Sequence, residues 1–91
     1  MYAKKCRISI LCGLHARIGV LISDEAVKYQ DHEKVFIRNV YGDHKTTEVG
    51  SVMGLLLLAA TNYTILEVFS EDDTAAVTVD KIAAFIDGLR E

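Results

Sequence analysis

The spacing of the apolar residues changes at Gly13, and this change limits the folds that the chain can adopt. Residues 4–11 alternate between apolar and polar side chains, a period of two that predicts a strand with one buried face. Residues 16–29 place apolar side chains at helical spacing, which predicts an amphipathic helix. The apolar positions of this helix are Ile18, Leu21, Ile22, Ala26 and Tyr29. The chain therefore opens with a strand that leads directly into a helix.

The same two periods recur along the rest of the chain. Short strands are expected at 35–37, 46–49 and 63–69, a two-turn helix at 52–59, and a last helix after the acidic residues 71–73. The apolar stripe of the last helix is Ala75, Val79, Ile82, Ile86 and Leu89. The order strand, helix, strand, strand, helix, strand, helix predicts an α+β domain over residues 1–91. We expect a four-stranded antiparallel sheet with three helices on one face.

Composition excludes several classes of protein. The chain has 91 residues, 51% of them hydrophobic, which favours a folded domain over disorder. Ten basic and thirteen acidic residues give a net charge of −3, unsuited to direct nucleic-acid binding, which depends on neutralised phosphates. The most apolar stretch, 52–60, is about half the length that a membrane-spanning helix needs, so no membrane insertion is expected.

The two cysteines predict a reducing compartment. On one extended strand Cys6 and Cys12 would lie roughly 20 Å apart, too far for a disulfide, at about 3.3 Å per residue. We expect free thiols and a cytoplasmic protein, with the monomer as the default state. No metal or organic cofactor is expected, because the chain lacks a second pair of metal-type residues and any nucleotide-binding fingerprint.

The junction between the first strand and the first helix combines three features of a phosphoryl site. A neutral histidine such as His15 is a nucleophile that can carry a phosphoryl group on nitrogen. The N-terminus of a helix favours bound anions, and Arg17 can bring a planar guanidinium to phosphate oxygens. The alternative is that His15 caps the helix and Arg17 is a solvated charge. The local pattern alone favours this simpler interpretation.

Ser51 and the apolar run that follows it form a second candidate site. Serine before an apolar run is a favoured N-cap, and a phosphoserine at that position would alter the choice of partner through its charge. The apolar residues from Val52 to Leu58 surround the helix axis. Some of them are therefore expected to remain exposed as a partner surface, although a helix sunk into the core is an equal alternative.

Two segments resemble a known family. Residues 13–17, Gly-Leu-His-Ala-Arg, are similar to the active-site motif of HPr, the histidine-containing phosphocarrier of the phosphoenolpyruvate-dependent sugar phosphotransferase system. Residues 51–55, Ser-Val-Met-Gly-Leu, resemble the regulatory-serine segment of HPr from Gram-positive bacteria. The order of elements is also that of the HPr fold, an open-faced β-sandwich. The resemblance spans nearly the whole chain.

The resemblance implies a role for each residue of these segments. His15 would accept a phosphoryl group from enzyme I and pass it to a sugar-specific enzyme II A component, with Arg17 stabilising the phosphate. Ser51 would be phosphorylated by HPr kinase/phosphorylase, and the phosphorylated protein would recruit a catabolite-control repressor. The docking surface would comprise Val52, Met53, Leu55 and Leu56. Such a protein is a stoichiometric carrier and a kinase substrate rather than a turnover catalyst.

The chain departs from the family pattern at several positions. Ile18 stands where HPr has proline, Gly19 replaces a usual alanine, Gly50 replaces a common lysine, and Cys12 occupies a position that is commonly polar. The stretch from Arg17 to Ser51 is a few residues longer than usual. Two alternatives therefore remain. One is a diverged regulatory module that acts through Ser51 and the apolar helix without phosphoryl transfer, and the other is a binding domain that shares only the fold.

Overall fold

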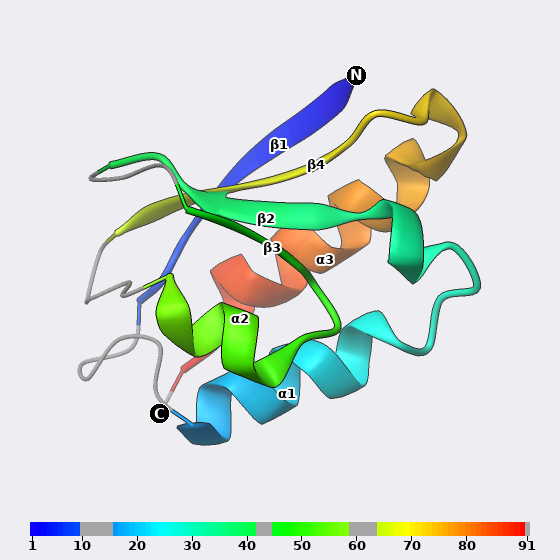
Figure 1. Cartoon of the computed structure of the whole chain (residues 1–91). Coiled ribbons are helices and arrows are strands. Elements are labelled where there is room, and N and C mark those ends of the chain that lie inside the picture. Colours follow the sequence, from blue (N-terminus) through cyan, green and yellow to red (C-terminus); the bar gives the residue numbers. More distant parts are fainter. Residues whose placement is uncertain (10–15, 42–44, 59–63, 91) are drawn as a thin grey trace.

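A four-stranded antiparallel sheet forms one layer of the protein and three helices form the other (Figure 1). The computed structural model describes residues 1–9, 16–41, 45–58 and 64–90. The strands are β1 (Tyr2–Arg7), β2 (Phe36–Asn39), β3 (Thr46–Glu48) and β4 (Ile65–Ser70), in the spatial order β1-β4-β2-β3. The helices are α1 (Ala16–Ala26), α2 (Val52–Leu57) and α3 (Ala76–Gly88), with 3-10 turns η1 (His32–Lys34) and η2 (Asp73–Ala75). The predicted fold class and order of elements are confirmed.

The core lies between the sheet and the helices. Along β4 burial alternates, so that Leu66, Val68 and Ser70 point inward, as the period of two predicts. The largest fully buried side chains come from every layer of the fold: Ile8, Ile18, Ile22, Ile37, Leu55, Leu66, Ile82 and Ile86. On the opposite face of the sheet the rings of Phe36 and Phe69 stack with their centroids 5.8 Å apart. None of the described helices covers that face (Figure 1).

The bounds of the first strand differ from those predicted. The strand begins at Tyr2 rather than at residue 4, and its regular pairing with β4 ends at Arg7. Ile8 adds one further hydrogen bond, its N–H donating to the carbonyl of Thr64 at 3.1 Å. The expected alternation holds, because Cys6 and Ile8 are buried and Arg7 is exposed. Residues 10 and 11 of the predicted strand, and Cys12, lie outside the described residues.

The first helix is shorter than predicted, and its predicted apolar stripe is buried at Ile18, Ile22 and Ala26 but not at Leu21. It ends at Ala26 instead of continuing to Tyr29, and the side chain of Leu21, predicted to be buried, is 41% exposed. Buried positions follow i, i+4, i+8 spacing, at Ile18, Ile22 and Ala26. Because each helical residue turns about 100°, Leu21 points away from that stripe. None of the described helices is long and apolar enough to cross a membrane.

Candidate functional site

Arg17 lies in the first turn of α1 and its side chain is exposed to solvent. Among the described residues no carboxylate forms an ion pair with it. His15, the predicted phosphoryl acceptor, lies outside the described residues and directly precedes Ala16, at which α1 begins. Ile18, which stands where the family has proline, is fully buried in the core.

Ser51 is the N-cap of α2. Its backbone is extended, with φ −97° and ψ 107°, and its Oγ accepts the N–H of Gly54 at 3.0 Å. The backbone N–H of Ser51 donates to the carbonyl of Glu48 at 3.2 Å, which fixes the turn that leaves β3. The residue is half-buried. The predicted capping role is therefore confirmed.

Helices α1 and α2 pack against each other in antiparallel directions (Figure 1). A Cβ built on Gly19 would lie 3.6 Å from Val52 and 3.7 Å from Leu56, so this glycine lets the helices come close. One turn further along α1, the Ser23 hydroxyl donates to the carbonyl of Gly50 at 2.7 Å. The beginning of α1 therefore lies near the end of α2, whereas Ser51 lies beside the middle of α1.

The predicted docking residues separate into exposed and buried ones. Met53 is 70% exposed, and Val52 and Leu56 are half-buried. The assignment of Leu55 to the docking surface is wrong, because this side chain is fully buried. Leu55 and Leu58, three residues apart, turn the same side of the helix to the core and hold α2 against the fold.

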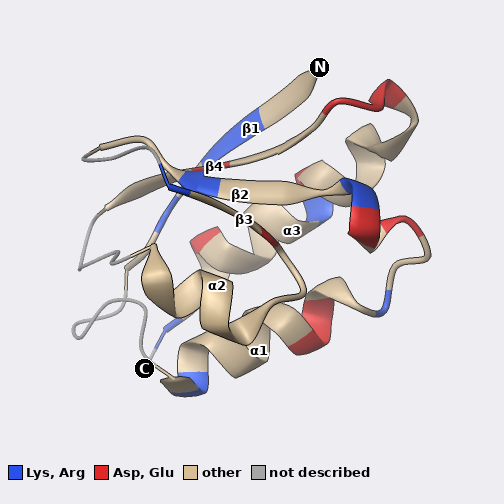
Figure 2. Cartoon of the chain, viewed as in Figure 1, with Lys and Arg blue, Asp and Glu red and all other residues tan. Residues whose placement is uncertain are grey.

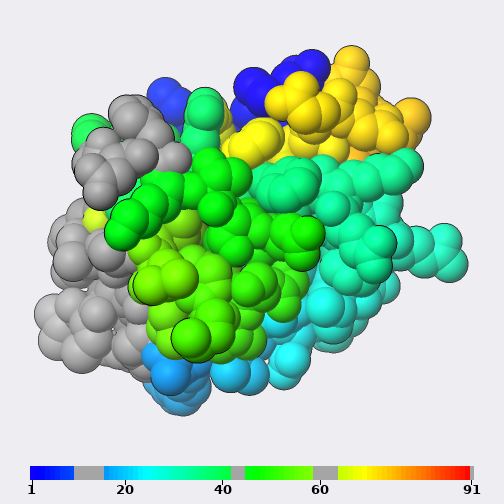
Figure 3. Space-filling view, viewed as in Figure 1, coloured from blue at the N-terminus to red at the C-terminus, as the bar shows by residue number. Residues whose placement is uncertain are grey.

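Leu57, which belongs to the apolar run expected to be partly exposed, is 64% exposed. The structure adds two exposed apolar residues that the sequence did not single out as a surface, Val20 at 44% and Leu21 at 41%. Helix α2 carries no charged side chain along its length, as Figure 2 shows. Figure 3 shows α1 and α2 side by side on one face of the molecule. We call Val20, Met53 and Leu57 the α1–α2 face. The i, i+4 spacing of Met53 and Leu57 is the signal that could have identified this pair.

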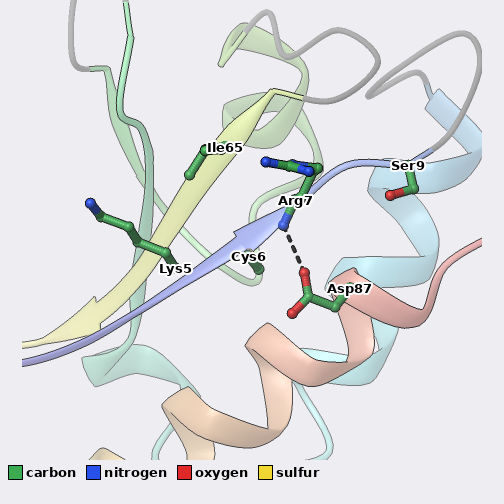
Figure 4. A pocket seen from close by; sticks show the side chains of 6 residues that line it. All are labelled: Lys5, Cys6, Arg7, Ser9, Ile65 and Asp87. Atoms are coloured by element: carbon green, nitrogen blue, oxygen red, sulfur yellow. Dashed lines mark hydrogen bonds between the residues drawn. The ribbon is translucent and has the colours of Figure 1, made fainter.

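A separate hollow of about 420 Å³ opens beside β1, lined by Lys5, Cys6, Arg7, Ser9, Ile65 and Asp87 (Figure 4). The backbone N–H of Arg7 donates to the Asp87 carboxylate there, at 2.8 Å. Burial, followed by the Asp87 charge, raises the pKa of the Cys6 thiol to about 12. A thiol with so high a pKa is unreactive at neutral pH, so the hollow lacks a nucleophile of that kind.

Comparison with known proteins places this geometry in a family. A search of curated protein sequences found no match. Among solved structures, the phosphocarrier protein HPr from Bacillus anthracis is 29% identical, with a TM-score of 0.72 over 91% of this chain and 93% of that one. HPr-C-His from Thermoanaerobacter tengcongensis is 21% identical, with a TM-score of 0.69 over 98% of both chains. The histidine-containing phosphocarrier protein of Mycoplasma is 20% identical, with a TM-score of 0.65 over 88% of this chain and 89% of that one. These last two likenesses support the fold.

The family model that matches describes the phosphorylation site of the HPr component of the phosphotransferase system. The match extends over residues 2–88 and therefore includes both candidate sites. The fold, the order of elements and this match agree with one another. The chain belongs to the HPr family of phosphocarriers of the phosphotransferase system.

Proposed function

We propose that the protein accepts a phosphoryl group on His15 from enzyme I and passes it to a sugar-specific enzyme II A component in the cytoplasm. In the first step a bond forms between a ring nitrogen of His15 and phosphorus, and the bond from phosphorus to enzyme I breaks. In the second step the phosphorus forms a bond to the enzyme II A acceptor, and its bond to the His15 nitrogen breaks. The imidazole needs no other reactant, because its neutral form is well populated near neutral pH.

The observation that carries this proposal is the exposed Arg17, which pairs with no carboxylate among the described residues and lies one residue past the start of α1 and two residues after His15. A guanidinium in that position can hydrogen-bond the phosphoryl oxygens through two parallel N–H groups. The apolar residues of the α1–α2 face are exposed, and exposed apolar side chains suit a surface for protein partners. A carrier needs such an open site, since its donor and acceptor must both reach the same atom.

The regulatory part of the proposal concerns Ser51. Ser23 is hydrogen-bonded to the turn before Ser51 and lies six positions after Arg17 on α1. Six positions correspond to about 9 Å along a helix. A phosphate on Ser51 would therefore act mainly through the shared α1–α2 face. It would add close to two negative charges beside Met53, repelling one class of partner and recruiting another, such as a catabolite-control repressor.

Incubation with phosphoenolpyruvate and purified enzyme I tests the transfer role. We expect intact-mass analysis to show one added phosphate that mild acid removes, and His15→Ala to show none. His32→Ala is the matched control, because His32 is a half-buried histidine whose Nδ1 lies 2.8 Å from the carbonyl of Tyr29. This variant should be phosphorylated like the parent. Equal phosphorylation of His15→Ala and the parent would contradict the proposal.

A second function is favoured by the capped helix and its exposed apolar side chains. In this alternative the protein does not transfer phosphate and binds a partner through Ser51 and Met53. Capture of that partner should then respond to Ser51→Asp and be indifferent to His15→Ala. If Met53→Glu and Ser51→Asp both leave capture unchanged, this alternative fails.

A further inference from the structure

The turn that precedes Ser51 is held from α1 by one buried hydroxyl. Ser23 is 7% exposed, and its Oγ donates to the carbonyl oxygen of Gly50 at 2.7 Å. Gly50 is the residue directly before the cap. Within the described part of the chain, buried polar side chains are found at Ser23, Ser70 and Thr78. A buried hydroxyl that reaches a neighbouring element is therefore an uncommon feature of this core.

Packing encloses the same turn from two sides. A Cβ built on Gly50 would lie 3.5 Å from Val27 and 3.6 Å from the ring of His32. One turn before Ser23, Gly19 approaches Val52 at van der Waals distance. Gly50 is half-buried, and its carbonyl accepts the hydroxyl of the buried Ser23. A partly shielded carbonyl that loses its donor costs free energy, and Ser23 supplies that donor.

We infer that Ser23 is a positioning residue for Ser51, because it fixes the Gly50 carbonyl and thereby holds Ser51 in its capping geometry. This inference rests on the proposed role of Ser51 as a modification site. In that reaction the Ser51 oxygen attacks the γ-phosphorus of ATP. The bond from that phosphorus to the bridging oxygen breaks, ADP leaves, and the hydroxyl proton passes to a base of the kinase. The hydrogen bond from the Gly54 N–H occupies one lone pair of the Ser51 oxygen and fixes its side chain, so attack should be faster once that bond is released. A turn anchored on α1 resists the release.

Amide hydrogen exchange of the Ser23→Ala variant tests the positioning role without any kinase. The amides of Gly54 and Leu55 donate to the side chain and the carbonyl of Ser51. We expect both to exchange about tenfold faster in the variant, because an unsatisfied carbonyl favours local opening of the turn. The slow amides of β4 and α3 should change much less.

Ser70→Ala is the matched control. It also removes a buried serine hydroxyl, one that accepts the N–H of Asp72 at 3.1 Å and does not contact Gly50. We expect this variant to leave the exchange of Gly54 and Leu55 close to that of the parent. The positioning role would be overturned if Ser23→Ala accelerated all slow amides by one factor, or if Ser70→Ala had the same local effect.

Phosphorylation kinetics test the regulatory consequence. With ATP and purified HPr kinase/phosphorylase, Ser23→Ala should be modified on Ser51 with a several-fold higher kcat/KM than the parent, while Ser70→Ala should match the parent. Faster exchange with an unchanged kcat/KM would overturn the regulatory role of Ser23. If neither the parent nor any variant is modified, the proposed role of Ser51 fails, and hydrogen exchange still decides whether Ser23 positions the turn.

A reciprocal measurement does not depend on the Ser23 variant. Ser51→Ala removes the cap from the other side of the same turn. If the two residues are coupled through Gly50, the amide resonances around Ser23 should shift together with those of α2. Shifts that are confined to α2 would contradict the coupling.

Discussion

Gly54 occupies a position where no larger residue fits. A Cβ built on it would lie 1.8 Å from the Thr47 hydroxyl oxygen and 2.7 Å from the Thr47 Cβ, distances that force a shift of α2 away from β3. The N–H of the same residue donates to Ser51. Any displacement of Gly54 therefore disturbs both the packing of the helix and its cap.

We expect Gly54→Ala to lower the free energy of unfolding by about 1–3 kcal/mol, the usual cost of an overpacked site. Gly88→Ala is the control, because a Cβ at Gly88 meets no atom within 4 Å. In α3 that substitution should be neutral or stabilise by up to about 1 kcal/mol. Urea unfolding measures both changes. Equal effects would show that the contact with Thr47 does not restrict position 54.

The buried Cys6 thiol makes a contribution to stability that is lost at alkaline pH. Burial and the nearby Asp87 raise its pKa from 9.0 to about 12. The unfolded chain therefore loses this proton first, so the contribution to stability is complete below pH 9 and is lost between pH 9 and pH 12. Cys6→Ala should lose less stability over that interval than the parent. The folded parent should also resist alkylation of Cys6 at pH 8, as peptide mapping would show.

At the scale of single elements, α2 begins at the Ser51 cap and exposes apolar side chains on one side. Its buried side is Leu55, its exposed side is Met53 and Leu57, and Ser51 closes its first turn. A six-residue helix has little stability of its own and depends on packing and capping. Changes at its exposed side should therefore affect partners, and changes at its cap should affect stability.

Ser51→Ala and Ser51→Asp separate the effect of the helix cap on stability from the effect of a negative charge on transfer. Ser51→Ala should lower the free energy of unfolding by about 1 kcal/mol, the usual value of an N-cap. Ser51→Asp keeps an acceptor for the Gly54 N–H and should unfold close to the parent, yet exchange phosphate with enzyme I more slowly. Thermal unfolding and transfer rates check the two halves. Loss of stability in Ser51→Asp as large as in Ser51→Ala would contradict the capping argument.

Met53→Glu should impair transfer without unfolding the protein. Because Met53 is 70% exposed, the substitution should change stability by no more than about 0.5 kcal/mol. It places a charge in the apolar α1–α2 face and should reduce the rate of phosphorylation by enzyme I. Val77→Glu is the matched control, since Val77 is 63% exposed on α3, outside that face. Equal rates for the two variants would contradict docking at the α1–α2 face.

At the scale of the whole molecule, hydrophobic periodicity predicted the order of elements and the fold class, and the preference of serine for the N-cap position predicted the Ser51 cap. It failed where burial depends on the direction of a neighbouring element. Leu21 and Leu55 both fit a helical apolar pattern, yet Leu21 is exposed and Leu55 is fully buried. Leu55 belongs to the core cluster, whereas α1 buries Gly19 and Ser23 beside Ile18 and Ile22. Gly19 and Ser23 are small residues that meet α2 and the turn before it, and they carry no hydrophobic signal.

The first residues of the chain are held by η2 and α3. Three aspartates at intervals of seven residues make these contacts: Asp73 in η2, and Asp80 and Asp87 on α3. Their partners are the amino group of Met1 at 3.4 Å, the hydroxyl of Tyr2 at 2.6 Å and the backbone N–H of Arg7 at 2.8 Å. Strand β1 lies at the edge of the sheet, with a neighbouring strand on one side only. Asp87 accepts the backbone N–H of Arg7 at this edge, as a neighbouring strand would do inside a sheet.

Asp87 is the member of this series that contacts the strand backbone (Figure 4). Asp87→Ala removes the acceptor and should lower the free energy of unfolding by about 1 kcal/mol, whereas Asp87→Asn keeps an acceptor oxygen and should lose less. Both variants remove the charge that helps to raise the pKa of Cys6, so that pKa should fall in each. Asp24→Ala, at an exposed position on α1, should change neither quantity. Urea unfolding and titration of the thiol measure the two effects. If Asp87→Ala and Asp24→Ala unfolded alike, the junction between β1 and α3 would owe its stability to apolar packing alone.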